Sequence, residues 1–154
     1  MTKFLVGCLA LTIGVAAFAQ NSQGIAYGSG FMITGRGTTV RTDFWVASTP
    51  AGVYGKFWYE DRQRGGRSDN VEIRINRFHG FSCEDLGVAF YGEGYVNSTP
   101  RVIIVQALDG VWYPDLFWVG AFHPISMTLL YDRYAQFTQG GVSVLCDLPS
   151  GPDN

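Results

Sequence analysis

Short runs that alternate between apolar and polar residues dominate this chain, and they constrain its fold more than any other feature. In residues 70–79, the clearest run, Val71, Ile73 and Ile75 alternate with polar neighbours. Successive side chains of a strand point to opposite faces, so this pattern predicts a β-strand with one buried and one wet face. No segment keeps the helical period over three turns, and the sequence therefore predicts strands rather than helices.

Runs of this kind predict nine strands, at 25–34, 38–48, 53–60, 70–79, 86–96, 101–108, 115–122, 127–134 and 142–148. Turn-forming residues separate them, including Asp109-Gly110 and Gly140-Gly141. Gaps of hairpin length indicate that consecutive strands pair antiparallel, because a parallel pair requires a long crossover. We expect one all-β antiparallel domain of about eight to nine strands, either an up-and-down barrel or a sandwich.

Glycines within the expected strands favour a barrel over an open sandwich. These glycines are Gly28, Gly30, Gly87, Gly92 and Gly94. Glycine weakens a strand, so its presence usually marks a bulge, a sharp bend or a close backbone approach. Closed barrels use such glycines to turn corners.

The N-terminus has the layout of a signal peptide. Lys3 precedes an uncharged run over 4–18, and Ala17-Phe18-Ala19 fits the small-x-small pattern of a cleavage site. We expect residues 1–19 to be removed after Ala19, which predicts a secreted or periplasmic protein. The Leu-Val-Gly-Cys sequence at 5–8 also resembles a lipobox, although few residues precede its cysteine.

The remaining chain is expected to form a single all-β domain at 20–148, followed by a flexible tail at 149–154. No stretch reaches the roughly 20 apolar residues that a membrane-spanning helix requires, so we predict no membrane span. The formal net charge is −2, and this weak negative field argues against a nucleic acid partner, which needs a clustered basic face.

Cysteine usage points to one disulfide. Cys8 leaves with the signal peptide, so Cys83 and Cys146 remain, and two cysteines in an exported chain predict a bond between them. Two buried free thiols are the alternative. A Cys2His2 zinc site that adds His79 and His123 is disfavoured because the four residues lack closely spaced ligand pairs. We expect no metal and no cofactor.

Aromatic residues make up 15% of the chain and supply the first candidate ligand contacts. Trp45 and Trp58 fall on strand faces that also carry Asp43, Lys56 and Glu60, so these faces form either a wet outer wall or a polar lumen. Exposed aromatic rings stack on sugars, which makes a glycan a candidate ligand. Packing of these rings in the core is the interpretation that the composition favours.

Two further groups of residues are candidate ligand contacts. Arg62, Arg64 and Arg67 lie at a hairpin tip, where guanidinium groups could bind an anionic group. The alternative is a solvated tip whose charge Asp61 and Asp69 nearly cancel.

Asp109 and Asp115 flank an acidic loop that could contribute oxygen ligands to Ca²⁺, although only these two carboxylates are available there. The alternative is a hairpin loop that Asp109 begins.

One resemblance to a known family rests on glycine and turn positions. The residues that carry it are Gly28-Ser29-Gly30-Phe31, the Ala-Phe-Tyr-Gly-Glu-Gly-Tyr-Val-Asn run at 89–97, the Asp-Gly at 109–110 and the Asp-Leu-Phe at 115–117. Over about residues 28–122 this pattern resembles the secreted bacterial post-COAP-type β domains. The resemblance implies an extracellular β module and offers no catalytic residue to carry over.

Catalytic motifs give little support for an enzyme. The chain has no Gly-x-Ser-x-Gly and no His-Glu-x-x-His, and the adjacent Glu84 and Asp85 would point to opposite faces of a strand. We therefore expect a non-catalytic binding or structural module with an extracellular ligand or protein partner. A lipocalin-like carrier of small molecules is the first alternative, and a small β-fold hydrolase or isomerase is the second.

Overall fold

Eight antiparallel strands close into one barrel, with each strand paired to its neighbours in sequence and β8 paired back to β1. The computed structural model describes residues 22–35, 37–62, 70–111 and 113–146. The strands are β1 (Gly24–Thr34), β2 (Thr39–Thr49), β3 (Gly52–Asp61), β4 (Val71–Glu84), β5 (Gly87–Val96), β6 (Thr99–Leu108), β7 (Leu116–Phe122) and β8 (Leu129–Cys146). The all-β antiparallel prediction is confirmed, and of its two forms the structure is the barrel.

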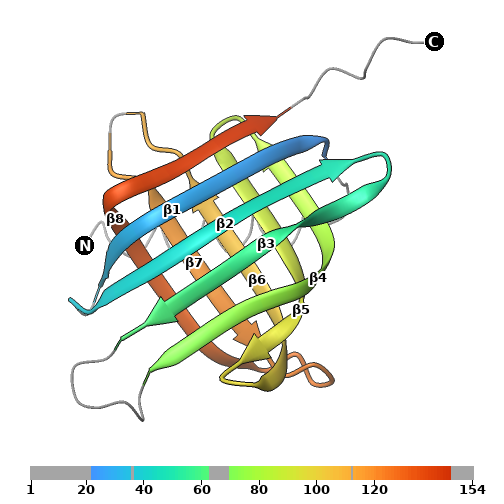
Figure 1. The fold of residues 1–154 in the computed structure, drawn as a ribbon, viewed down its shortest axis with the longest axis vertical. Coiled ribbons are helices and arrows are strands. Elements are labelled where there is room, and N and C mark those ends of the chain that lie inside the picture. The colour runs from blue at the N-terminus through green and yellow to red at the C-terminus, as the bar shows by residue number, and fades with distance from the viewer. Residues whose placement is uncertain (1–21, 36, 63–69, 112, 147–154) are drawn as a thin grey trace.

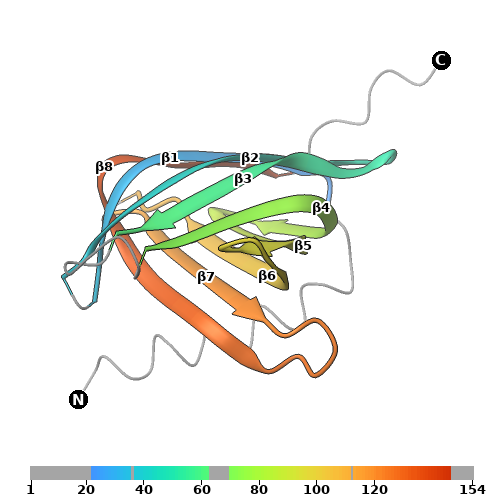
Figure 2. The ribbon, with the colours of Figure 1, turned by 60° about the horizontal axis from the view of Figure 1, so that its bottom comes forward.

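The barrel has two ends, which we name from Figure 1. The upper end carries the start of β1, the end of β8 and the β2–β3, β4–β5 and β6–β7 connections. The lower end carries the β1–β2, β3–β4, β5–β6 and β7–β8 connections. In Figure 1 the strands in front cross those behind, and the turned view of Figure 2 shows the two walls facing each other across the interior.

The predicted break near the C-terminus is wrong, because the last two expected strands form the single 18-residue β8. Gly140, which was expected in a turn, instead pairs with Gly30 across the β1–β8 ladder, close to a register shift in β1. Both glycines have positive φ, 82° at Gly140 and 152° at Gly30. Glycine tolerates these conformations, so the strand bends at this point and continues.

β4 is also longer than its alternation predicted. It runs to Glu84 rather than ending at 79, and its pairing with β5 shifts register twice, between Ile75 and Arg77 and between Phe78 and Gly80. Each bulge inserts an extra residue that breaks the strict alternation of buried and exposed side chains. The alternating pattern therefore ends at the bulges, although the strand continues beyond them.

Aromatic and aliphatic side chains fill the barrel interior. Phe44 and Phe90 have ring centroids 5.5 Å apart, and Phe57 stacks on Phe117 with centroids 6.3 Å apart. All four rings are at most 2% exposed. Burial of each such side chain contributes about 1.5–3 kcal/mol to folding. The middle of the barrel is therefore a packed aromatic core.

The predicted disulfide between Cys83 and Cys146 is present. It joins the end of β4 to the end of β8, two strands that are not neighbours in the sheet, with Cα atoms 5.7 Å apart. The bond therefore ties opposite walls together at the upper end. It also engages both sulfurs, so the cysteines do not contribute thiolates to a zinc site.

Several sequence predictions fall outside the described residues. These are the signal peptide at 1–19, the tail at 149–154, and Arg64 and Arg67. Among the described residues, no helix is long and apolar enough to cross a membrane. The same residues contain no group of three or more His, Cys, Asp or Glu side chains placed to hold a metal ion.

Candidate functional site on the outer wall

An exposed aromatic cluster lies on the outer wall of β1, β2 and β3. Tyr27 pairs directly with Trp45 across the β1–β2 ladder, and the ring of Tyr54 on β3 meets Trp45 edge-on with centroids 6.0 Å apart. The three residues are 51%, 44% and 47% exposed in that order. We call this cluster the aromatic platform.

Strand alternation explains why Trp45 points outward. Its neighbours Phe44 and Val46 are buried in the barrel interior, so Trp45 must face the opposite side of the strand. The buried Phe44 and Phe57 support β2 and β3 from behind, and this backing holds the platform on a rigid sheet.

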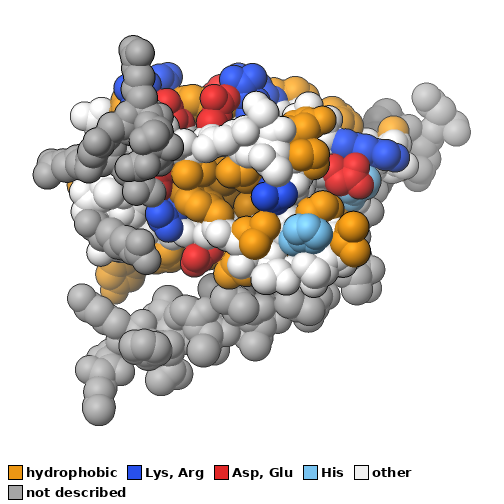
Figure 3. Space-filling view, turned by 90° about the horizontal axis from the view of Figure 1, so that it is seen from below, with side chains coloured by type: hydrophobic (Ala, Val, Ile, Leu, Met, Phe, Trp, Pro, Cys, Tyr) orange, Lys and Arg blue, Asp and Glu red, His pale blue; other side chains and the backbone are white. Residues whose placement is uncertain are grey.

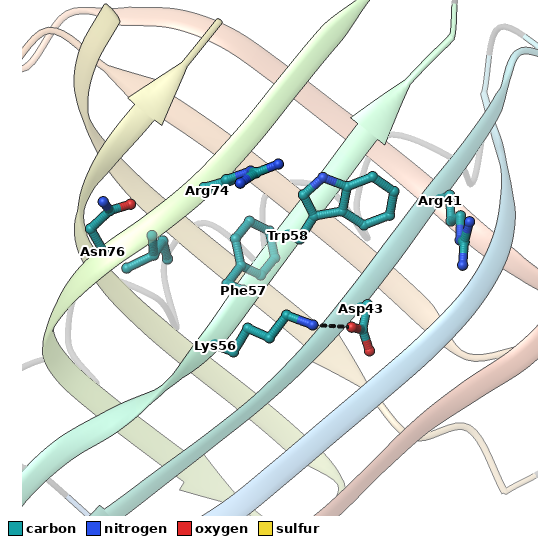
Figure 4. A pocket seen from close by; sticks show the side chains of 8 residues that line it. Arg41, Asp43, Lys56, Phe57, Trp58, Arg74 and Asn76 are labelled. Carbon is teal, nitrogen blue, oxygen red and sulfur yellow. Dashed lines mark hydrogen bonds and ion pairs between the residues drawn. The ribbon is translucent and has the colours of Figure 1, made fainter. Parts of the chain in front are cut away.

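A groove continues from the platform toward the lower end of the same wall. It has a volume of about 420 Å³, and the polar and aromatic residues along it that are exposed or partly exposed are Arg41, Asp43, Lys56, Trp58, Arg74 and Asn76. Figure 4 shows Trp58 between Arg74 and Arg41, with the Lys56–Asp43 pair beside it. We call this feature the cationic groove.

Pairing across the sheet connects the groove to the platform. Lys56 is the direct partner of Trp45 on the β2–β3 ladder, and Trp58, two residues further along β3, pairs with both Asp43 and Arg74. Residues directly opposite on one face have Cβ atoms about 4.5–5.5 Å apart. The groove is therefore continuous with the platform on this face of the sheet.

Two exposed ion pairs lie at the groove. Lys56 Nζ is 2.6 Å from Asp43 Oδ2, and Arg74 Nε donates a hydrogen bond to Glu72 Oε1. The side chains in both pairs are 45% to 64% exposed. Exposed pairs of this kind contribute about 0–1 kcal/mol, so a ligand can compete for their cations at low cost.

Arg41 is held differently, by aromatic rings. Its guanidinium carbon lies 5.6 Å from the ring centroid of Phe31 and 5.5 Å from that of Trp58. Among the described residues, no carboxylate lies within ion-pair distance of Arg41. Its direct ladder partner is Glu60, whose carboxylate pairs with Arg62 instead, so aromatic rings and not an ion pair hold the guanidinium of Arg41.

The structure brings Trp45 and Trp58 together on one wall, and it places that wall outside the barrel rather than around a lumen. Arg62 lies at the end of β3 and forms an ion pair with Glu60, with Nε 3.0 Å from Oε2. Sequence reasoning did not single out Arg41 or Arg74, because neither belongs to a local cluster. Only the strand register reveals them.

Of the two loop carboxylates that were candidate Ca²⁺ ligands, the side chain of Asp115 instead binds backbone N–H groups. Asp115 accepts hydrogen bonds from the backbone N–H of Gly110, at 2.8 Å, and of Val142, at 2.6 Å. One bond goes to each of its carboxylate oxygens, so Asp115 fastens the β6–β7 connection to β8. Asp109 is held through its own N–H, which donates to the carbonyl of Leu86. Neither residue lines the cationic groove.

A second cluster, which we call the buried polar cluster, lies inside the lower end of the barrel. Arg133 Nε and the Tyr131 hydroxyl both donate to Asp61 Oδ2, at 2.9 Å and 3.0 Å, and the Tyr59 hydroxyl lies 3.1 Å from that of Tyr131. Asp61 is 0% exposed. Its Oδ1 has no hydrogen-bond partner among the described residues.

Figure 3 looks onto the lower end of the barrel, where hydrophobic side chains gather near the centre of the described surface.

Burial changes the protonation of the tyrosines in this cluster. Loss of hydration raises the pKa of Tyr131 well above its usual range, and the nearby Tyr59 and Asp61 raise it further. Burial also raises the pKa of Tyr59. Both hydroxyls therefore keep their protons and act as donors.

The interpretation of Asp61 as a charge that cancels the arginine tip is wrong, because its carboxylate points inward to Arg133.

The comparisons with known proteins find no match. No protein-family model matches the chain, and no curated protein or solved structure matches it at a significant level.

Proposed function

We propose that this protein is an exported, non-catalytic binding module that holds carbohydrate on its outer wall. The observation that carries this proposal is the aromatic platform, in which Tyr27, Trp45 and Tyr54 expose 44% to 51% of their surface side by side on three strands. Aromatic faces stack on the apolar faces of sugar rings. Contiguous exposed aromatic surface usually marks an interaction site.

The polar groups beside the platform suit the same ligand class. Asp43 supplies carboxylate acceptors and Lys56 supplies N–H donors next to Trp45. Sugar hydroxyls need both acceptors and donors, whereas an apolar ligand needs neither. A platform built on strands also loses little conformational freedom on binding, which favours affinity.

The packed interior supports binding on the wall rather than transport in a lumen. The rings of Phe44, Phe57, Phe90 and Phe117 occupy the space that a lipocalin-like carrier would leave for its ligand.

Export is part of the proposal, supported by the signal-like N-terminal sequence and by the Cys83–Cys146 bond. Disulfides persist mainly in oxidising compartments. The mass of protein recovered from the exported fraction tests this part, since cleavage after Ala19 leaves a chain that begins at Gln20.

Substitution of the platform tests carbohydrate binding. We expect Trp45→Ala to lower affinity for a bound polysaccharide by at least about tenfold, because an aromatic anchor at a binding site typically contributes more than about 1.4 kcal/mol. Calorimetric titration and retention on a polysaccharide panel measure the effect. Tyr134→Ala is the matched control, since Tyr134 is 44% exposed but lies on β8.

Two results would contradict the proposal. One is the absence of binding to every polysaccharide in the panel by the wild-type protein. The other is an equal loss of affinity in the Trp45 and Tyr134 variants, which would place the binding surface elsewhere.

A small-molecule site at the lower end is the second candidate function, and one observation favours it. Asp61 Oδ1 is buried and unpartnered among the described residues, and such orphaned oxygens are uncommon in folded proteins. A small ligand that carries an N–H or O–H donor would satisfy Oδ1 while Arg133 and Tyr131 keep their bonds to Oδ2. Native mass spectrometry of the exported protein, repeated after denaturation, tests this candidate, because a bound ligand appears as mass that unfolding releases.

A further inference from the structure

We propose that the cationic groove makes this module selective for acidic polysaccharides, whose sugar carboxylates it binds next to the aromatic platform. This inference rests on the proposed carbohydrate binding and names the substrate class of the same wall. Three cationic side chains line the groove, Arg41, Lys56 and Arg74, against one carboxylate, Asp43. Glu60 and Glu72 border the groove, so only its lining residues are net positive, in a chain whose formal net charge is −2.

Arg41 is the cation best prepared to receive a carboxylate. The rings of Phe31 and Trp58 flank its guanidinium, and no described carboxylate lies within ion-pair distance of it. A planar guanidinium binds a carboxylate through two parallel hydrogen bonds. Because stacking has already restricted the side chain, less conformational freedom is lost when the ligand binds.

Lys56 and Arg74 provide further cations that can change partners. Their ion pairs with Asp43 and Glu72 are exposed to solvent and contribute little to stability. A sugar carboxylate can therefore replace the protein carboxylate at small cost. Arg41 on β2 pairs with Glu60 of β3, and Arg74 on β4 pairs with Trp58 of β3, so one strand and an offset of two residues separate the two arginines and place their backbones about 12 Å apart. Trp58 lies between them, as Figure 4 shows.

Continuity with the platform favours a polymer of sugars over a free anion. Trp45 is the direct ladder partner of Lys56, so one sugar stacked on Trp45 places the next unit of the chain over the groove.

The wider charge pattern disfavours a nucleic acid at this wall. Glu60 pairs with Arg62, and Glu72 pairs with Arg74, so two carboxylates limit the basic surface at the lower end of the groove. Nucleic acid binding requires a longer basic surface that neutralises many phosphates.

The test compares one polymer in two charge states. Polygalacturonate and hyaluronan are each offered as the free acid and as the methyl ester, which keeps the sugar chain and removes the charge. We expect the wild-type protein to bind at least one free acid about fivefold to tenfold more tightly than its ester, as hydrogen bonds to charged groups predict. This preference is expected to shrink between about 50 mM and 300 mM NaCl.

Variants separate the groove from the platform. We expect Arg41→Gln/Arg74→Gln to abolish the difference in affinity between acid and ester, and Trp45→Ala to weaken binding of both forms while it keeps that difference. Arg101→Gln is the charge control, because Arg101 lies on β6 and donates to the carbonyl of Pro100. Thermal unfolding of each variant confirms that the barrel is intact.

Each outcome bears on one of the two proposals. Equal binding of acid and ester would overturn the selectivity and leave the carbohydrate module standing. Binding of neither form of either polymer, together with no binding across the neutral panel, would overturn the proposed function itself. An equal effect of Arg101→Gln and the groove variant would show that net charge, and not the groove, sets the preference.

Discussion

Asp61 carries a carboxylate that is 0% exposed, at the lower end of a strand that otherwise buries apolar residues. Removal of two charges from water is expensive, and the buried polar cluster compensates for it through Arg133 and Tyr131. The interior tolerates Asp61 because Arg133, 72 positions later in the chain, supplies a cation that binds its carboxylate.

Loss of that cation should be severe. Arg133→Met leaves Asp61 buried without a counter-charge, and we expect the free energy of unfolding to fall by about 3–5 kcal/mol. Urea denaturation measures the change. Arg62→Gln is the control, because its ion pair with Glu60 is exposed and should contribute less than about 1 kcal/mol. In the double variant Asp61→Asn/Arg133→Met, part of the loss should be recovered. A loss no larger than that of the control would contradict the role of Arg133 as the compensating partner of Asp61.

The two buried tyrosines should make the barrel sensitive to alkali. Their pKa values are raised in the folded state, so the folded chain keeps protons that the unfolded chain releases above about pH 10. Stability is therefore fully present below that pH and is lost as the pH rises, by about 1.4 kcal/mol per pH unit for each retained proton. Urea midpoints between about pH 8 and pH 11 measure this slope. Tyr131→Phe and Tyr59→Phe should each flatten it, and an unchanged slope in both would contradict the explanation.

Individual strands illustrate how far sequence patterns reach. Alternation predicted the bounds of the strands from β1 to β7 to within a few residues, except the end of β4, which continues past its bulges to Glu84. The prediction of a turn at Gly140-Gly141 was wrong, because these glycines lie within a strand. Gly140 and Gly30 lie opposite each other and allow β8 to bend, a role that the sequence indicated for Gly30 but not for Gly140, which was expected in a turn.

A side chain at this bend should be poorly tolerated. Gly140 has a φ of 82°, and a Cβ there would collide with the backbone carbonyl oxygen of Ser29. We expect Gly140→Ala to lower the free energy of unfolding by about 1–3 kcal/mol, from backbone strain together with the clash. Gly35→Ala is the control, because a Cβ at Gly35 meets nothing within 4 Å. Chemical denaturation of both variants compares them, and equal stability would show that β8 relaxes freely at this point.

The whole barrel is closed by pairing of β8 with β1 and is fastened at its upper end by the disulfide. The bond links residues 63 positions apart, so it restricts the unfolded chain considerably. The polar cluster connects β3 and β8 at the opposite end, so both ends of the barrel have a link between strands that are not neighbours.

Loss of the disulfide should destabilise the molecule without changing its fold. For Cys83→Ser/Cys146→Ser we expect a decrease of about 4 kcal/mol in the free energy of unfolding, from loop-closure entropy. Chemical denaturation with and without reductant measures the effect. The reduced wild-type protein should match the variant. A variant as stable as the oxidised protein would contradict the link between the disulfide and closure of the barrel.

The sequence by itself determined which residues share a strand face, because alternation is a local property with a period of two. It therefore placed Trp45 opposite Phe44, predicted antiparallel strands, and paired the two cysteines by elimination. Only the tertiary structure decided which face is inside and which strands meet. The aromatic platform, the cationic groove and the pairing of Asp61 with Arg133 all depend on register between strands or on closure of the barrel. These contacts join residues far apart in the chain, and no local pattern encodes which distant strand each side chain will face.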